Sequence, residues 1–563
     1  MRPEAILLFV LVCGVALSSA VSVRAQSTPE PGVTPTPFAQ PALSPTPSGS
    51  PASSESPLPS GSPGASATPS GSPSPTPTPT LPPITASPEA AFIPVGATQA
   101  VTIEGSLGNL TAVPASTAYF TFTIDQDQRQ VLITGTTPGS TTITITDSRG
   151  VSVTVGVRVA FPAGSLPQPL TLNVTGDPAS SDFLKRLVVN QILRYTQVRP
   201  GAQAIVTPDD VNVGDLAQDI VANVNVPVLI QGEQYFDVNG SVPVTLNNIA
   251  VPRISPDQLM VSDFPEKLTE NGILFTADLK REVPSRFLYY HYNPPGQPDR
   301  RIVLVAQNES SEPATVQFIS GRGSAKYEME AGHAATRDFL VDVVQNQGRL
   351  LQIPGNATQV IAQQAMPAGA IVTNLLQLRV LEGSTVHLTL VAQNATDDPA
   401  TALTTGQLLT STVRHARGIY TVPEFHFATQ WNVNDAYLDL PIGQVPLPNS
   451  LAGEALSGDY GVLESFVVNV QNPLSTPANI AIYESPRGGS ATGSYLIDGV
   501  LVQSHQVKAF TRYKVRQYVV PAKGFVRITI VTMPEAGSSY PLNLTFAPDD
   551  GSVAPGGPGS PVY

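Results

Sequence analysis

Apolar side chains occupy every second position over long stretches of this chain, and this period of two restricts those stretches to β-strands. The alternation is strict between residues 90 and 160, where it involves Phe120, Phe122, Ile124, Ile143, Ile145, Val151, Val153, Val155, Val157 and Val159. Successive side chains of a strand point to opposite faces, so each set forms one buried face. Turn sequences at 137–140 and 147–150 separate the strands, which predicts an antiparallel sandwich.

The same segment carries a more specific pattern. A Gly-Thr turn, a Thr/Ile strand, a polar turn and a valine-rich strand follow one another from Thr134 to Val159. In this order the segment resembles the C-terminal half of the bacterial Ig-like (Big) domain, and the resemblance covers residues 88–161. It implies an Ig-like sandwich on an exported bacterial protein, commonly a spacer or adhesive module. It transfers no catalytic residue to this chain.

The N-terminus has the features of an export signal. Residues 5–23 carry no charge, follow Arg2 and end near small residues, so we interpret residues 1–25 as a signal peptide. The apolar run approaches the roughly 20 residues that span a bilayer, so an uncleaved signal anchor is the alternative. The single cysteine, Cys13, lies in this run, and the mature chain would therefore hold no disulfide and no thiolate metal site. We expect an extracellular or cell-envelope location.

Residues 26–87 are rich in Pro, Ser and Thr and have too few apolar side chains to offset the entropy of ordering. We predict a disordered, semi-rigid linker there. A stalk that crosses an envelope layer and a passive, O-glycosylated linker are both compatible with this composition. The Gly/Pro/Ser-rich residues 549–563 predict a disordered tail.

The remaining sequence divides into three further units by pattern. Residues 168–255 predict a small α+β domain, because apolar residues recur at helical spacing over 180–195 and strand-like runs follow. Residues 256–375 predict a β-sandwich-like domain, and residues 376–548 one or more β-rich domains. The expected fold class is mainly β: tandem Ig-like or β-sandwich modules with one small α+β unit.

One motif occurs three times in the second half of the chain. An apolar strand ends at Asn308, Asn394 and Asn472, and a Pro-Ala pair follows five residues after each asparagine. Asparagine can hydrogen-bond its own backbone, and proline is tolerated at the start of a strand. The motif therefore predicts one hairpin design used three times, as in tandem sandwiches or one long β array.

The chain is acidic, with a formal net charge of -13, which argues against nucleic-acid binding. Residues 499–534 nevertheless contain six basic residues and no acidic one. Among these, Arg512, Lys514 and Arg516 alternate, so on a strand they would form one face. We predict an anion-binding face there; the alternative is a solvated face whose acidic partners come from an adjacent strand.

Few residues of the sequence indicate a catalytic or metal-binding site. No Gly-x-Ser-x-Gly elbow occurs in the ordered body, and Gly321 and Gly323 lack the spacing of a phosphate loop and predict a turn. His291 in 289–292 and His426 in 424–426 are weak metal candidates, against which stands the interpretation as polar strand residues. The segments 125–127 and 432–435 suggest calcium loops or ordinary Asx turns. The sequence predicts no catalytic residue, cofactor or metal.

Three functions remain in view. The first is a non-enzymatic exported protein with a structural or adhesive role, whose partner would be a surface polysaccharide or another envelope protein. The second is an anionic glycan- or ligand-binding module centred on Arg512, Lys514 and Arg516. The third is an exported hydrolase or metalloprotein whose residues are assembled from distant loops.

Overall fold

The computed structural model describes residues 82–552 except 282, 405 and 452. The predicted signal segment, most of the predicted linker and residues 553–563 lie outside the described residues. Two predicted boundaries are wrong at their edges. Residues 85–87, assigned to the linker, form a strand of the first module, and residues 549–552, assigned to the tail, are placed by contacts with a neighbouring strand. In the described part, no helix has both the length and the apolar character needed to cross a membrane.

The first module is a sandwich of two four-stranded sheets, which confirms the β-sandwich expected from the alternation. Its core contains Ile143, Ile145 and Val155, all fully buried, as their period predicted. One sheet has the order β1 (Thr85–Ser87), β3 (Thr98–Glu104), β6 (Gln130–Gly135), β5 (Phe120–Asp125). The other has the order β2 (Ala90–Pro94), β8 (Ser152–Ala160), β7 (Gly139–Thr146), β4 (Thr111–Pro114).

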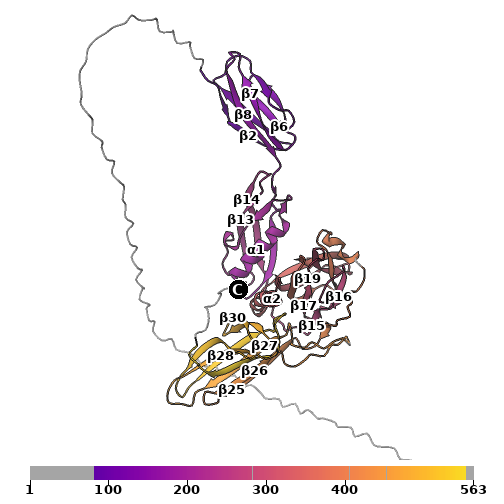
Figure 1. Cartoon of the computed structure of the whole chain (residues 1–563), viewed down its shortest axis with the longest axis vertical. Coiled ribbons are helices and arrows are strands. Elements are labelled where there is room, and N and C mark those ends of the chain that lie inside the picture. The colour runs from indigo at the N-terminus through magenta and orange to yellow at the C-terminus, as the bar shows by residue number, and fades with distance from the viewer. Residues whose placement is uncertain (1–81, 282, 405, 452, 553–563) are drawn as a thin grey trace, which may run out of the picture. The chain divides into compact units, whose positions relative to one another are not determined.

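A ten-stranded sheet takes strands from the next three predicted units (Figure 1). Its order is β12 (Gln203–Ile205), β13 (Val221–Gln231), β14 (Val238–Asn248), β10 (Leu170–Thr175), β20 (Gly348–Ile353), β19 (Ala314–Ala325), β22 (Ile371–Glu382), β17 (Ser285–Tyr292), β15 (Gln258–Ser262), β24 (Arg417–Tyr420). The first two of these units join where β10 pairs with β20, at Val174 opposite Arg349. The boundary expected at 375 falls inside β22, because that strand is continuous.

The helix predicted over 180–195 is confirmed as α1 (Ser181–Tyr195). The Ser180 side chain accepts a hydrogen bond from the amide of Phe183, which satisfies one free N–H of the first turn. The buried face of α1, which includes Leu184, Val188 and Ile192, belongs to the same core as β13 and β14. Three short elements complete this unit: β9 (Gly164–Ser165), β11 (Gln197–Val198) and η1 (Pro208–Asp210).

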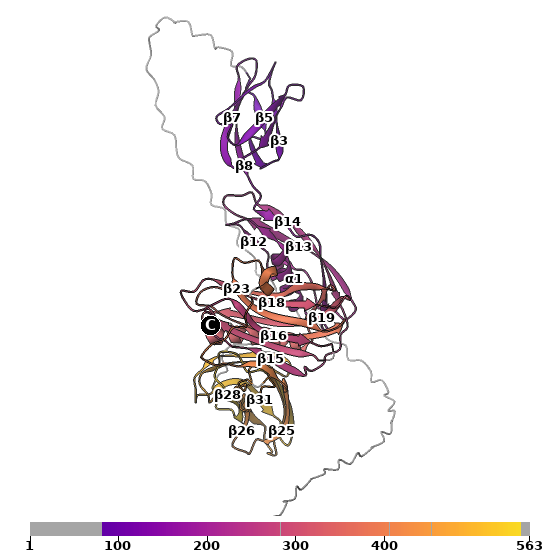
Figure 2. The same ribbon diagram turned by 90° about the vertical axis from the view of Figure 1, so that its right-hand side faces the viewer.

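A second sandwich forms where a four-stranded sheet faces the middle of the ten-stranded sheet (Figure 2). Its order is β16 (Gly272–Leu279), β23 (Val386–Asn394), β18 (Arg300–Asn308), β21 (Ala357–Met366), and η2 (Pro399–Thr404) follows β23. The opposite face of β19 and β22 is covered by α2 (Glu328–Val344), which we did not predict. Gly321 and Gly323, predicted as a turn, lie in β19, where a Cβ on either would collide with the α2 backbone.

The third sandwich is formed by the C-terminal residues, and its core includes Trp431, Phe466, Tyr495 and Phe546. One sheet has the order β25 (Glu424–Asn432), β27 (Leu463–Gln471), β32 (Phe525–Thr532), β29 (Ala491–Ile497), β30 (Val500–Val507). The facing sheet has the order β26 (Leu438–Ile442), β33 (Leu542–Pro548), β28 (Ala478–Pro486), β31 (Tyr513–Val520).

The repeated Asn…Pro-Ala motif does not form hairpins, so that prediction is wrong. In the first and third copies the chain leaves one sheet and enters the facing sheet: β18 and β19 belong to different sheets, as do β27 and β28. Facing sheets lie about 10 Å apart, twice the spacing of paired strands, so the polar segment spans the sandwich edge as an arch. In the second copy η2 follows Asn394 in place of a strand.

The asparagine holds each arch from inside. The Asn308 side-chain amide donates to the carbonyl oxygens of Glu312, Ile353 and Pro354 at 2.8, 3.2 and 3.2 Å, and its Oδ1 accepts the amide of Ser310 at 3.1 Å. Asn472 donates to the carbonyls of Thr476 and Val520 at 2.8 and 3.1 Å and accepts the amide of Leu474 at 3.0 Å. Both asparagines are fully or almost fully buried.

Replacing Asn308 by alanine is expected to lower the free energy of unfolding by about 1–3 kcal/mol, because buried carbonyls lose their donor. The matched control is Asn394→Ala, in a half-buried copy of the motif that bonds Asp397, where water can replace the lost bond. Urea unfolding followed by circular dichroism measures both variants. Equal losses in the two would contradict the arch interpretation.

Candidate functional site

A cleft of about 490 Å³ opens beside the end of the β15–β24 strand pair and faces loops of the C-terminal sandwich. Four carboxylates line it, from Asp263, Glu266, Glu328 and Glu454, against one arginine and one histidine, Arg414 and His415. We call this the acidic cleft. Its other polar and aromatic lining residues include Tyr290, Tyr460, Ser538 and Ser539. Concave sites of this kind are typical binding sites where domains meet.

Three side chains converge at one end of the acidic cleft. His415 Nε2 lies 3.2 Å from Glu266 Oε2, and His415 Nδ1 lies 3.6 Å from Asp263 Oδ2. One ligand-type atom from each of the three residues lies within 4.8 Å of the other two. The backbone amide of Asp263 donates to the carbonyl of Ala416 at 2.9 Å, which continues the β15–β24 ladder and fixes the carboxylate beside the imidazole.

The surroundings shift the pKa values of both Asp263 and His415. Burial raises the pKa of Asp263 to about 6, although the hydrogen bond and charge of His415 act in the opposite direction. The hydrogen bond to Asp263 raises the pKa of His415 above its usual value, against the opposing effect of burial. Asp263 Oδ1 is buried and has no hydrogen-bond partner in the described structure. This buried carboxylate oxygen therefore lacks the hydrogen bond that buried polar atoms normally make.

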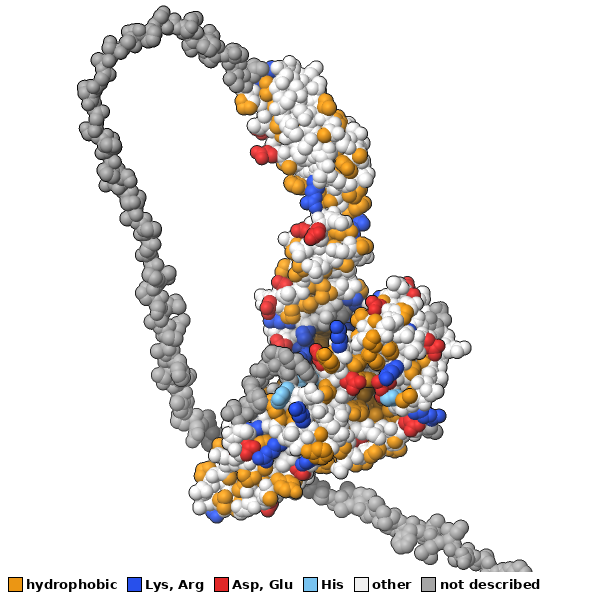
Figure 3. All heavy atoms as spheres, viewed as in Figure 1, with side chains coloured by type: hydrophobic (Ala, Val, Ile, Leu, Met, Phe, Trp, Pro, Cys, Tyr) orange, Lys and Arg blue, Asp and Glu red, His pale blue; other side chains and the backbone are white. Residues whose placement is uncertain are grey.

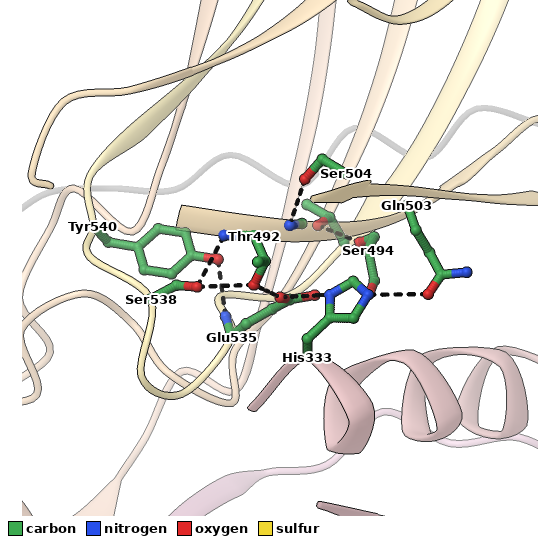
Figure 4. Close-up of polar contacts among 10 residues, drawn as sticks. His333, Thr492, Ser494, Gln503, Ser504, Glu535, Ser538 and Tyr540 are labelled. Atoms are coloured by element: carbon green, nitrogen blue, oxygen red, sulfur yellow. Dashed lines mark hydrogen bonds and ion pairs between the residues drawn. The ribbon is translucent and has the colours of Figure 1, made fainter. Parts of the chain in front are cut away.

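Behind one wall of the acidic cleft, a buried polar network joins α2 to the C-terminal sandwich (Figure 4). His333, on α2, contacts Glu535 through Nδ1 at 2.9 Å and Gln503 through Nε2 at 3.0 Å. The Thr492 hydroxyl donates to the same Glu535 carboxylate at 2.5 Å, and the Glu535 amide donates to the Tyr540 hydroxyl at 2.9 Å. We call this network the His333–Glu535 junction.

The His333–Glu535 junction is arranged to hold domains together. The carboxylate lies between hydroxyl and imidazole, whereas in a nucleophile–histidine–acid triad the imidazole lies between the other two groups. Burial lowers the pKa of His333, but the charge and hydrogen bond of Glu535 outweigh it and raise the pKa overall. Ser538 bonds Thr492 at 3.0 Å, and its carbonyl accepts the Tyr460 hydroxyl at 2.7 Å, so the junction supports the cleft wall.

A second concave site has the opposite charge. This arginine cavity, of about 490 Å³, lies between α1, α2 and strands β19 to β21, and three of its lining residues are Arg194, Arg322 and Arg349. Figure 3 shows basic side chains beside a hollow in the region where α1, α2 and β19 lie in Figure 1. Within the described residues, no carboxylate lies at ion-pair distance from these three arginines. Two carboxylates also line the cavity: Asp342 pairs with Arg186, a fourth lining arginine, at 3.0 Å, and Asp338 pairs with Arg337.

Arg349 shows the effect of this crowding of positive charge. Burial, together with the charges of Arg194 and Arg322, lowers its pKa to about 10. Its guanidinium carbon lies 5.3 Å from the centre of the Phe318 ring, which is a cation–π contact. An anion bound in the cavity would offset the repulsion among the three arginines.

The three residues of the predicted anion-binding face make contacts within the protein. Lys514, whose side chain is 1% exposed, contacts the Asp549 carboxylate, and Arg512 pairs with Asp550 at 2.9 Å. Arg516 donates to the carbonyl of Ile497 at 2.6 Å. The alternative, a solvated face with acidic partners from an adjacent strand, holds only in part: Arg512 and Lys514 do have acidic partners, but these follow β33 in sequence, and Lys514 is buried. Anion binding by this face stays a prediction.

Among the described residues, neither histidine singled out from the sequence belongs to a group of three side chains that could hold a metal ion. His291 is buried, bonds the Pro265 carbonyl through Nδ1 at 2.9 Å and the Ser262 hydroxyl through Nε2 at 3.2 Å, and has its pKa lowered to about 4 by burial. His426 lies 3.7 Å from Glu424 and is largely exposed. In the candidate calcium segment 125–127, Asp125 accepts backbone amides within its own turn, as an Asx turn does.

Sequence reasoning missed Asp263, Glu266 and His415 because the carboxylates and the histidine are far apart along the chain. They meet only because β15 pairs with β24. No local spacing in the sequence predicts the pairing of β15 with β24. The Asp-x-x-Glu spacing at 263–266 is the one local signal, and on its own it is too common to be informative.

Comparisons with known proteins identify no family for this chain. No protein-family model and no curated protein matches this chain. Among solved structures, Drosophila N-cadherin EC1-4 is 14% identical with a TM-score of 0.12. The match covers 30% of this chain and 50% of the cadherin chain. Clostridium thermocellum CbhA fibronectin(III)-like modules are 12% identical with a TM-score of 0.16, covering 30% and 94%. The Bacteroides ovatus glucan-utilization protein SGBP-B, solved with a mixed-linkage heptasaccharide, is 10% identical with a TM-score of 0.13, covering 54% and 73%.

These matches are distant similarities to Ig-like, cadherin and fibronectin type III β-sandwich modules. Their low identities and TM-scores assign this chain to no family, and the fold rests on the sheets described above.

Glu535→Gln is expected to destabilise the domain junction by about 3–5 kcal/mol, because it leaves the buried His333 without its counter-charge. The control is Asp278→Asn, which breaks the half-exposed His387–Asp278 pair of 2.8 Å and should cost under about 1 kcal/mol. Differential scanning calorimetry compares the two variants. A loss no larger for Glu535→Gln than for Asp278→Asn would show that the junction contributes little.

Proposed function

We propose that this chain is an exported, non-enzymatic protein of the bacterial cell envelope with a structural or adhesive role, and that residues 88–161 form a bacterial Ig-like domain. The observation that supports the proposal is the direct connection between modules. The ten-stranded sheet runs through two of them, and the His333–Glu535 junction fixes α2 to the C-terminal sandwich. Connections of this kind favour one relative geometry of the modules, which suits a presented contact surface.

A buried ion pair reinforces the same connection. Arg286 of β17 is fully buried and bonds Glu424 of β25 at 2.8 Å and the Pro423 carbonyl at 2.7 Å. The ten-stranded sheet is thereby tied to the C-terminal sandwich at a second place. Since the mature chain is predicted to contain no cysteine, such contacts would replace the disulfides common in exported proteins.

Export is tested by locating the protein in the source cells. We expect an antibody against the described body to detect the chain in the envelope fraction or the medium, shortened by the predicted signal peptide. Protease added to intact cells should digest it, while a cytoplasmic marker stays intact. Recovery of full-length, protease-protected chain with the cytoplasmic marker would overturn the proposal.

A second candidate function is binding of an anionic ligand, such as an acidic polysaccharide, and the arginine cavity favours it. Arg194, Arg322 and Arg349 converge from three elements and lack carboxylate partners among the described residues. Arginine recognises carboxylate, sulfate and phosphate groups through paired N–H donors. In this second proposal the candidate anion site differs from Arg512, Lys514 and Arg516.

The double variant Arg322→Ser with Arg349→Ser is expected to lose retention on an immobilised acidic polysaccharide, because two of the three converging charges are removed. The matched control is Arg512→Glu, which alters the face predicted from sequence. Elution salt concentration measures both. If Arg512→Glu weakens retention and the double variant does not, the sequence-predicted face is the binding site and the arginine cavity is not.

A further inference from the structure

Beyond the proposed structural role, the acidic cleft contains a constellation that the sequence did not announce. We propose that Asp263, Glu266 and His415 bind a divalent cation of the zinc class. The site would lie at the end of the β15–β24 pair, at the contact between the ten-stranded sheet and the C-terminal sandwich.

The first support is geometry. Ligands bound to zinc at about 2.0–2.2 Å in a tetrahedron lie about 3.3–3.6 Å from one another. His415 Nε2 and Glu266 Oε2 are 3.2 Å apart, and His415 Nδ1 and Asp263 Oδ2 are 3.6 Å apart. Because a single imidazole nitrogen ligates a metal, only one of these two distances is an edge of the coordination shell. The shared site rests on the wider cluster, in which one ligand-type atom from each of the three residues lies within 4.8 Å of the other two.

The second support is the missing hydrogen-bond partner of one Asp263 oxygen. Its Oδ1 is buried and has no hydrogen-bond partner in the described structure, while Oδ2 faces the imidazole. A buried carboxylate oxygen without a donor is costly, and a cation is one of the few groups that can satisfy it. The ladder bond from the Asp263 amide to Ala416 holds the carboxylate in this position.

The third support is charge. Arg414 pairs with Glu454 at 3.4 Å on the exposed rim, which leaves Asp263, Glu266 and Glu328 with His415 as the remaining charged groups of the cleft. Even with a protonated imidazole, these groups are net negative. Such a concave surface concentrates cations from solution.

The donor set selects the class of ion. One imidazole nitrogen and two carboxylate oxygens suit Zn²⁺ or Mn²⁺ and offer no thiolate for a softer metal. Three protein ligands also leave a coordination position directed at the cleft, where water or an oxygen of a bound molecule could complete the shell.

A competing arrangement would use the same side chains without metal: a protonated His415 bridging two carboxylates. The two are distinguished by titrating the chelator-treated full chain with Zn²⁺ against a chromogenic chelator. We expect one tight site per chain. His415→Gln, which keeps the size of the side chain, should weaken binding by about tenfold or more.

The matched control is His387→Gln, which removes a histidine that faces a single carboxylate, Asp278. Its zinc affinity should equal that of the unaltered chain. Zinc should also raise the melting temperature of the unaltered chain and of His387→Gln, but not that of His415→Gln, since a ligand stabilises only the state it binds. Circular dichroism establishes that each variant is folded.

Absence of stoichiometric zinc binding by the unaltered chain would overturn the site in favour of the bridging imidazolium. Equal affinities of the unaltered chain and His415→Gln would assign the zinc to other surface groups and overturn it as well. Neither result bears on export, so failure of this inference is distinguishable from failure of the proposed function.

Discussion

The close contacts of α2 on two sides are the constraint on which the rest of the structure depends. On one side, Gly321 and Gly323 let the helix backbone approach β19, because any Cβ there would collide with α2. On the other side, a Cβ on Gly332 would collide with the Ala536 backbone of the C-terminal sandwich. The helix therefore lies between two β-structures at distances that only glycine permits (Figure 1).

Buried polar groups make this contact specific. Apolar surfaces alone attract without fixing a geometry, whereas the His333–Glu535 and Arg286–Glu424 pairs form only when the units that carry them are suitably oriented. Their desolvation is costly, so their net contribution to stability is smaller than their short distances suggest. What they provide is a defined orientation of two sandwiches, and with it the shape of the acidic cleft.

Two concave sites of opposite charge result from this assembly. The acidic cleft lies where the ten-stranded sheet meets the C-terminal sandwich, and the arginine cavity lies where the α1 unit meets α2. Both occur at junctions between units, where groups from different elements meet and water still has access. The basic run at 499–534, the clearest charge feature of the sequence, is instead partly neutralised by Asp549 and Asp550.

The sequence by itself determined the local structure: the period of two in the first module, the helix α1 with its Ser180 cap, and the strand ends at Asn308, Asn394 and Asn472. These depend on neighbouring residues and on which face is apolar. Only the tertiary structure decided that the asparagines hold arches, that two glycines admit α2, and that His415 meets Asp263 and Glu266. Those outcomes depend on which distant strands pair, and period and local propensity are the same for many pairings.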